Sequence, residues 1–209
     1  MPRNRPPDLL LFWPLRRTFP MKKRFARWLL ARLGWRIEGA RPSEPRYVLI
    51  AAPHTSNWDF PLMLLFAAAY EIKVTWMAKD SLFWPPLGWA MRAMGGMPIT
   101  RHTRTGVVDS MVDAFSLHQN LVLVVPTEGT RARADYWKSG FYHIARQAGV
   151  PIVPSFLDFG SMRGGFGEPI PVTGNVPEDM ARFRTFYHGM RGKHVDLFGP
   201  ILLREEGDD

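Results

Sequence analysis

The feature that most constrains the fold of this chain is an alternation of short apolar runs with segments of helical periodicity. The apolar runs indicate strands at residues 47–53, 73–78, 97–100, 120–126 and 151–159. The helical segments between them cover residues 61–71, 86–96, 105–119 and 136–149. Strands separated by helices are typical of a largely parallel sheet, because parallel neighbours need a crossover connection. We therefore expect a single α/β domain whose helices flank the sheet, with residues 160–167 as a flexible loop inside it.

Composition narrows the possible chemistry. The chain has 209 residues, and its share of 46% hydrophobic residues is enough to fill the core of one domain. Cysteine is absent, which excludes disulfides, thiolate-bound metals and a cysteine nucleophile. The histidines show no ligand spacing with carboxylates, so we expect neither a metal nor a cofactor.

Positive charge is concentrated at the N-terminus. Residues 1–36 contain ten basic residues and one acidic residue, a net charge of +9, whereas the remainder has 17 basic and 18 acidic residues, a net charge of −1. A nearly neutral body argues against nucleic-acid binding, which favours a basic patch on the folded domain itself. We expect residues 1–36 to form a basic arm with an amphipathic helix, and residues 37–209 to form the main domain.

Two segments raise the question of contact with lipid. In residues 21–33, one helical face carries Met21, Phe25, Trp28, Leu29 and Leu33, while basic residues occupy much of the rest. Such a helix suits an anionic membrane surface; alternatively, it packs this stripe on its own domain. Residues 81–91, rich in Trp, Phe and Pro, leave similar alternatives of core or exposed lipid-contacting surface. No apolar run reaches about 18 residues, so we expect no membrane-spanning helix.

A histidine and an aspartate lie five positions apart between the first strand and the first helix, in "APHTSNWDFP" at residues 52–61. Pro61 fits the first turn of the helix, and Asp59 at or near the N-cap would satisfy free backbone amides. Alternatively, the Asp59 carboxylate holds one nitrogen of His54 and leaves the other nitrogen as a general base. The spacing alone does not choose between the two interpretations.

Further charged groups follow the other strands. "EGTR" at residues 128–131 comes directly after the strand at 120–126, and offers backbone amides, a hydroxyl and a guanidinium to an anion. Arg101 follows the strand at 97–100, Lys79 ends the strand at 73–78, and Lys138 lies further along the chain. Each is by itself a plausible surface cation. Together, at successive strand ends, they suggest a phosphate site close to a histidine base.

These blocks resemble the glycerolipid and lysophospholipid acyltransferases, the group that contains 1-acylglycerol-3-phosphate acyltransferase. The resemblance covers residues 46–158 and places four blocks in the family order. They are His54 to Asp59 with Ser56, Gly96 to Arg101, Glu128 to Arg131 followed by Lys138 and Gly140, and the proline-bearing strand at 150–154. The sequence departs from the family pattern at Thr127, Thr100 and Ala132, where the family often has proline, an acidic residue and serine.

The resemblance implies an activity. His54, oriented by Asp59, would take the proton from an acceptor hydroxyl, which attacks an acyl thioester directly. Glu128, Gly129 and Thr130 would contribute to acceptor binding, with Arg101, Arg131, Lys79 and Lys138 around its anionic head group. The donor would be acyl-CoA or acyl carrier protein, the acceptor a lysolipid, and the location the inner, cytoplasmic face of the cell membrane. A lipid hydrolase using the same pair and a non-enzymatic peripheral membrane protein are the alternatives.

Overall fold

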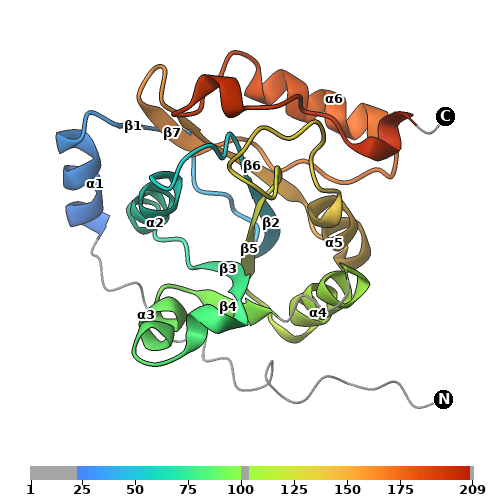
Figure 1. The fold of residues 1–209 in the computed structure, drawn as a ribbon, viewed down its shortest axis with the longest axis horizontal. Coiled ribbons are helices and arrows are strands. Elements are labelled where there is room, and N and C mark those ends of the chain that lie inside the picture. The colour runs from blue at the N-terminus through green and yellow to red at the C-terminus, as the bar shows by residue number, and fades with distance from the viewer. Residues whose placement is uncertain (1–22, 100–103, 208–209) are drawn as a thin grey trace.

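The computed structural model describes residues 23–99 and 104–207, and its centre is a sheet with the strand order β1-β7-β6-β2-β5-β3-β4 (Figure 1). The strands are β1 Arg36–Glu38, β2 Arg46–Ala51, β3 Val74–Lys79, β4 Gly96–Ile99, β5 Leu121–Pro126, β6 Ile152–Asp158 and β7 Arg163–Phe166. The α-helices are α1 Lys23–Arg32, α2 Asp59–Ala69, α3 Leu87–Ala93, α4 Arg104–Leu117, α5 Gly140–Ala148 and α6 Val176–Tyr187.

The sheet is largely parallel, as the alternation of strand and helix patterns predicts. Among the described strands, only β6 and β7 pair antiparallel, and every other neighbouring pair is parallel. The central pair, β2 and β5, stays in register from Arg46 opposite Leu121 to Ala51 opposite Pro126. Both strands therefore end at the same level, and their following loops leave the same edge of the sheet.

Both faces of the sheet are covered by helices. Along β2, Tyr47 and Leu49 belong to one buried cluster, and Val48 and Ile50 belong to the other. The first cluster lies beneath α1 and α2, and the second beneath α4, α5 and α6 (Figure 1). A strand buried on both faces is a continuous apolar run, which is why the strands at the centre of the sheet are the clearest in the sequence.

The helix α1 packs on α2 through a narrow strip. Ala26 and Leu30 are buried there, and the Lys23 ammonium pairs with Glu71 at 2.9 Å. Most of the face predicted from the sequence to be apolar points elsewhere, because Phe25, Trp28 and Leu33 are exposed, whereas Leu29 is partly buried against the same cluster. Met21, which completes that predicted face, lies outside the described residues. In the described part of the chain, no helix combines the length and apolar character needed to cross a membrane.

The prediction of a flexible loop at residues 160–167 is wrong, because residues 163–166 form β7 between β6 and β1. The glycines that suggested a loop permit close packing instead. A Cβ on Gly165 would lie 1.7 Å from the Glu38 carbonyl oxygen, and one on Gly164 would lie 2.5 Å from the Phe66 ring. Glycine in a strand often marks such close approaches, and here it allows β1 and α2 to pack against β7.

Other boundaries differ from the predicted ones. The helix predicted at 136–149 begins at Gly140, because Trp137 bridges to Leu203 and the Lys138 N–H donates to the Thr127 carbonyl at 2.7 Å. The short strand β1 and the helix α6 extend the predicted pattern at the two ends of the domain.

The packing of β7 predicts a contrast between two glycine substitutions. Gly165→Ala should lower the free energy of unfolding by about 1–3 kcal/mol, because the methyl group collides with the Glu38 backbone. Gly140→Ala is the control, since nothing lies within 4 Å of its added Cβ, and it should be neutral or stabilising. Urea unfolding of both variants provides the measurement. Equal stabilities for the two variants would mean that residues 163–166 form a loop.

Candidate active site

The turn between β2 and α2 brings His54 and Asp59 together. Asp59 is the first residue of α2, and its Oδ2 lies 3.2 Å from His54 Nδ1. The same oxygen accepts a hydrogen bond from the Ser56 N–H at 2.9 Å. Asp59 is buried, whereas the His54 side chain is 21% exposed. The imidazole is therefore held on one side by a buried carboxylate and reaches solvent.

Asp59 lies near the N-cap, as predicted, but the contacts of its carboxylate differ from the predicted contacts with helix amides. The N-cap residue is Trp58, which makes no side-chain capping hydrogen bond, and Asp59 begins the helix. Its carboxylate turns back toward Ser56 and His54 instead of toward the following amides. Pro61 does lie in the first turn of α2, where its missing N–H is not needed.

Glu128 approaches His54 from the neighbouring strand end. Its Oε2 accepts a hydrogen bond from the His54 backbone N–H at 3.1 Å, and the residue is 1% exposed. Burial raises the pKa of the Glu128 carboxyl to about 8, with a further increase from the Asp59 charge and an opposing effect of the His54 hydrogen bond. Among the described residues, its Oε1 has no hydrogen-bond partner. The raised pKa favours the uncharged form of the Glu128 carboxyl at neutral pH.

The residues after Glu128 turn outward. Gly129 has a positive φ of 66°, and a Cβ there would lie 2.9 Å from Lys138 Cγ, so the lysine stem covers the turn. The Thr130 hydroxyl accepts a hydrogen bond from the Ala132 N–H at 3.2 Å. Arg131 is exposed and extends into an adjacent cleft. The turn thus places Arg131 and the Lys138 stem on the same loop as buried Glu128.

Of the two remaining predicted cations, only Lys79 belongs to the described residues, and it lies on the other side of β5 from His54. Lys79 ends β3 and is exposed, at the same edge of the sheet as His54. Arg101, at the end of the second block, lies outside the described residues.

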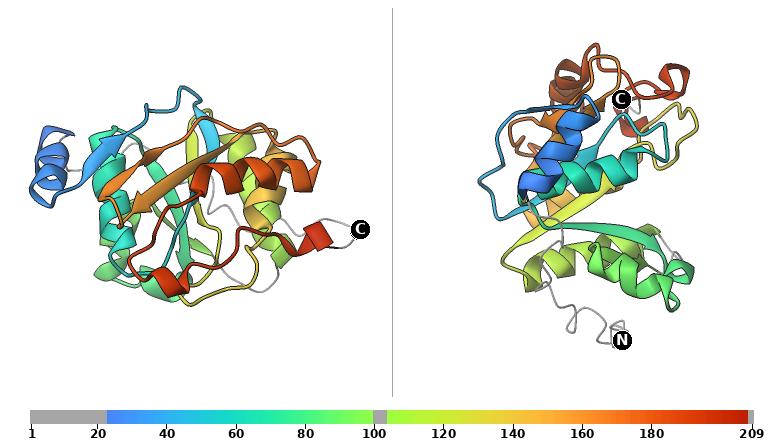
Figure 2. Two further views of the ribbon diagram at one scale, coloured as in Figure 1. Left: turned by 90° about the horizontal axis from the view of Figure 1, so that it is seen from above. Right: turned by 90° about the vertical axis from the view of Figure 1, so that its left-hand side faces the viewer.

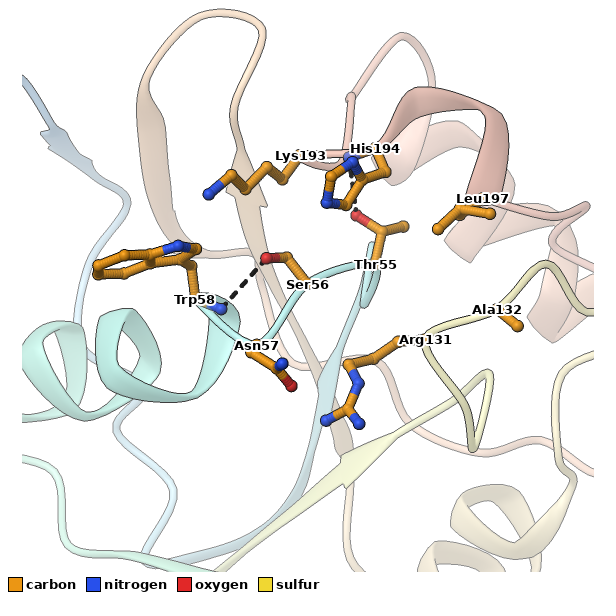
Figure 3. A pocket seen from close by; sticks show the side chains of 9 residues that line it. All are labelled: Thr55, Ser56, Asn57, Trp58, Arg131, Ala132, Lys193, His194 and Leu197. Atoms are coloured by element: carbon orange, nitrogen blue, oxygen red, sulfur yellow. Dashed lines mark hydrogen bonds between the residues drawn. The ribbon is translucent and has the colours of Figure 1, made fainter.

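An open cleft of about 580 Å³ adjoins the His54 turn (Figure 3). Sequence reasoning found Arg131 but missed another wall of this cleft, which Lys193, His194 and Leu197 form. The local sequence around these residues gives no sign of a site, because their position depends on contacts with residues far away in the sequence. The His194 N–H, for example, donates to the Thr55 hydroxyl at 3.2 Å.

This geometry suits proton transfer. When Nδ1 of a neutral imidazole donates to a carboxylate, the ring is fixed in one tautomer and Nε2 carries the lone pair of a general base. Glu128 fixes the backbone of the same histidine, so both the main chain and the ring of His54 are positioned. In the described part of the chain, no group of three or more His, Asp or Glu residues is arranged to hold a metal ion.

The sequence around this site matches a known class of enzymes. A model of the family described as Acyltransferase matches residues 34–158, which include β2, His54, Asp59 and Glu128. The chain belongs to this acyltransferase family.

Individual relatives share less than a third of their residues with this chain over the matched regions. The chain is 27% identical over 194 residues to the lyso-ornithine lipid O-acyltransferase of Pseudomonas aeruginosa, covering 87% of this chain and 71% of that protein. It is 29% identical over 131 residues to the 1-acyl-sn-glycerol-3-phosphate acyltransferase of Escherichia coli, covering 58% of this chain and only 52% of the relative. The 1-acyl-sn-glycerophosphate acyltransferase structure from Thermotoga maritima shares the fold, with a TM-score of 0.54 at 20% identity, covering 78% of this chain and 73% of that one.

The raised pKa of Glu128 predicts a pH-dependent stability difference. Between pH 4.5 and 8, the folded protein holds a proton on Glu128 that the unfolded chain releases, so this group makes stability fall as pH rises through that range. Glu128→Gln, which stays neutral and can still accept from His54, should therefore gain stability relative to wild type between pH 5 and pH 8.5.

Urea unfolding at the two pH values measures this difference. Glu168→Gln is the matched control, because Glu168 is exposed, and its difference from wild type should stay constant with pH. A Glu128→Gln difference that is also constant would show that Glu128 is ionised in the folded protein at neutral pH.

Proposed function

We propose that this protein transfers a fatty acyl group from a thioester donor to a hydroxyl group of a lysophospholipid or glycerol-phosphate-type acceptor, in phospholipid synthesis or remodelling. The observation that carries the proposal is the contact of His54 Nδ1 with the buried Asp59 carboxylate at 3.2 Å. The family match supports acyl transfer, and the names of the relatives from Pseudomonas aeruginosa and Escherichia coli support a lysolipid acceptor.

In the proposed reaction, His54 Nε2 takes the proton of the acceptor hydroxyl as its oxygen attacks the thioester carbonyl carbon. A carbon–oxygen bond forms, the carbon–sulfur bond breaks, and the proton on the imidazolium passes to the departing thiolate. Asp59 stabilises the imidazolium that forms between these steps. Base catalysis of this kind contributes about 10²–10⁴-fold, so positioning of both substrates must supply the rest of the acceleration.

Glu128 acts through His54 in this proposal. The resemblance to the family implies that Glu128 binds the acceptor, but its carboxyl is buried and hydrogen-bonded to the His54 N–H. Burial favours a positioning role, in which Glu128 holds the turn that carries the base. A neutral Glu128 also adds no second negative charge next to the Asp59–His54 pair.

Anionic substrate groups would meet the cations around the turn. We assign Arg131 to the acceptor head group and place Lys138, Lys79 and Arg101 around it. Arg131 suits this role because its exposed guanidinium lines the cleft next to Thr55 and Ser56. The donor is acyl-CoA or acyl carrier protein, both of which carry phosphate and are attracted by a basic surface.

The proposed location is the inner, cytoplasmic face of the cell membrane, with α1 as a contact. Phe25 and Trp28 are exposed on α1 and their rings lie 5.7 Å apart, while Arg24, Arg27 and Arg32 on the same helix are exposed. Exposed aromatic rings among basic side chains suit the head-group region of an anionic bilayer. The buried pair Ala26 and Leu30 leaves the aromatic residues free for this contact.

The segment that joins β3 to α3, together with the first turn of α3, offers a second apolar surface. Leu82, Trp84, Leu87 and Trp89 are exposed, with Trp84 reaching 76%, whereas Phe83 is buried and anchors the segment. This segment follows β3, so it lies at the edge of the sheet that carries His54 (Figure 2). We propose that it contacts lipid close to the active site.

Replacement of the proposed base tests the function. His54→Ala should lower kcat for acyl transfer from acyl-CoA to 1-acylglycerol 3-phosphate by about 10²–10⁴-fold, with the far-UV circular dichroism unchanged. The matched control is His143→Ala, an exposed histidine on α5, which should retain wild-type activity. Wild-type activity in a folded His54→Ala variant would eliminate the proposed mechanism. Release of free fatty acid by the wild type without any acceptor would identify a hydrolase.

Vesicle binding tests the proposed role of α1. Phe25→Ala/Trp28→Ala should weaken sedimentation with phosphatidylglycerol vesicles by about tenfold or more, because two aromatic anchors are lost. Wild-type binding should fall with added salt and with phosphatidylcholine in place of phosphatidylglycerol. Leu117→Ala, which removes an exposed leucine at the end of α4, is the control. Unchanged binding of the double variant would exclude α1 as the contact.

A further inference from the structure

The cleft beside His54 has a wall that the family match does not include. The match ends at residue 158, whereas Lys193, His194 and Leu197 come from a segment that follows α6. Figure 3 shows Lys193 and His194 on one side of the turn residues Thr55 and Ser56, with Arg131 on the other side. The cationic side chains of Lys193 and Arg131 therefore flank the turn that begins at His54.

Several contacts hold this segment against the turn. A Cβ on Gly192 would lie 2.5 Å from the Thr55 hydroxyl oxygen, so the backbone there is packed directly on the turn. The His194 N–H donates to that hydroxyl oxygen at 3.2 Å, and the Arg191 N–H donates to the buried Asp158 carboxylate at 3.1 Å. Arg133 donates to the Phe198 carbonyl at 3.0 Å. The position of Lys193 is thus fixed by the backbone on either side of it.

The charge of the cleft is uncompensated. No aspartate or glutamate lines it, and within residues 23–99 and 104–207 neither Lys193 nor Arg131 forms an ion pair. Some other arginines are paired, for example Arg184 with Glu206 at 2.7 Å. The Lys193 ammonium instead lies 5.0 Å from the centre of the Trp58 ring, a cation–π contact that orients it beside the turn.

We infer that Lys193 binds a phosphate group of a substrate in this cleft, next to the base His54. Phosphate is the expected ligand because the cleft offers an ammonium and a guanidinium with no competing carboxylate, alongside the exposed Asn57 amide. Thr55 follows His54 directly and touches the segment, so a phosphate at Lys193 would lie close to the reacting groups. This inference rests on the proposed acyl transfer and extends its substrate site beyond the family-matched region.

The phosphate has two possible sources, the acceptor head group and the donor's carrier. Steady-state kinetics of the full chain separates them with four substrates. The acceptors are 1-acylglycerol 3-phosphate and monoacylglycerol, and the donors are acyl-CoA and the phosphate-free thioester of N-acetylcysteamine. Lys193→Met should raise KM by about tenfold for the substrate whose phosphate Lys193 binds, either 1-acylglycerol 3-phosphate or acyl-CoA. It should leave kcat, and KM for the corresponding phosphate-free substrate, within twofold of wild type.

Two further variants separate binding from structure. Lys73→Met makes the same substitution at an exposed lysine before β3, at the opposite edge of the sheet, and should match wild type. Lys193→Arg keeps the charge and should restore most of the affinity. Equal changes in KM for substrates with and without phosphate, or no change at all, would overturn the inference.

Failure of the proposed function would be recognised separately, because the wild type would then transfer no acyl group to any acceptor. Isothermal titration with glycerol 3-phosphate and with coenzyme A tests the cleft in that case. Binding that Lys193→Met weakens and Lys73→Met does not would support the phosphate site. Equal binding by wild type and both variants, or no binding to the wild type, would reject it.

Discussion

The parallel pairing of β2 with β5 is the constraint on which the site depends. Because Ala51 lies opposite Pro126, the two strands end together, and Glu128 reaches the His54 N–H across the gap between their loops. The pairing is held from both faces, since Ile50 and Leu49 pack into different apolar clusters. A slip of one residue would turn each of these side chains to the opposite face and separate Glu128 from His54. Core packing and site geometry therefore share one cause.

Two carboxyl groups approach His54 in different environments, and this difference separates their roles. Asp59 Oδ2 accepts from the Ser56 N–H while it contacts the imidazole. Glu128 has one backbone hydrogen bond, and burial raises its pKa to about 8. This raised pKa favours a neutral carboxyl beneath the backbone of His54 at neutral pH. In the proposed mechanism, the Asp59 carboxylate supplies the negative charge that stabilises protonated His54, because its Oδ2 lies 3.2 Å from His54 Nδ1.

The sequence predicts the parallel sheet because its central strands are buried on both faces and form continuous apolar runs, such as β5 at Leu121–Pro126. It misplaces β7 because Gly164 and Gly165 look like a loop in a local pattern, although they are required by the approach of Phe66 and Glu38. The sequence offers the His54–Asp59 contact as one of two interpretations, and it becomes the favoured one only with the other blocks, since the two residues lie on either side of one short turn. The contact of Glu128 with the His54 backbone is harder to predict, because it depends on the register of two strands far apart in sequence.

Lys193 marks the limit of local sequence reasoning. Its place beside the turn results from backbone contacts of its neighbours, Gly192 against Thr55 and the His194 N–H to the Thr55 hydroxyl. Because these contacts involve main-chain atoms of the segment, the side chain at position 193 can change without loosening the attachment. His54, in contrast, is held by the side chains of Asp59 and Glu128, so replacing either residue removes a contact to it. Under the proposed function, the fold thus separates the base His54 from the charge that Lys193 adds to the cleft, so substitutions can alter the two independently.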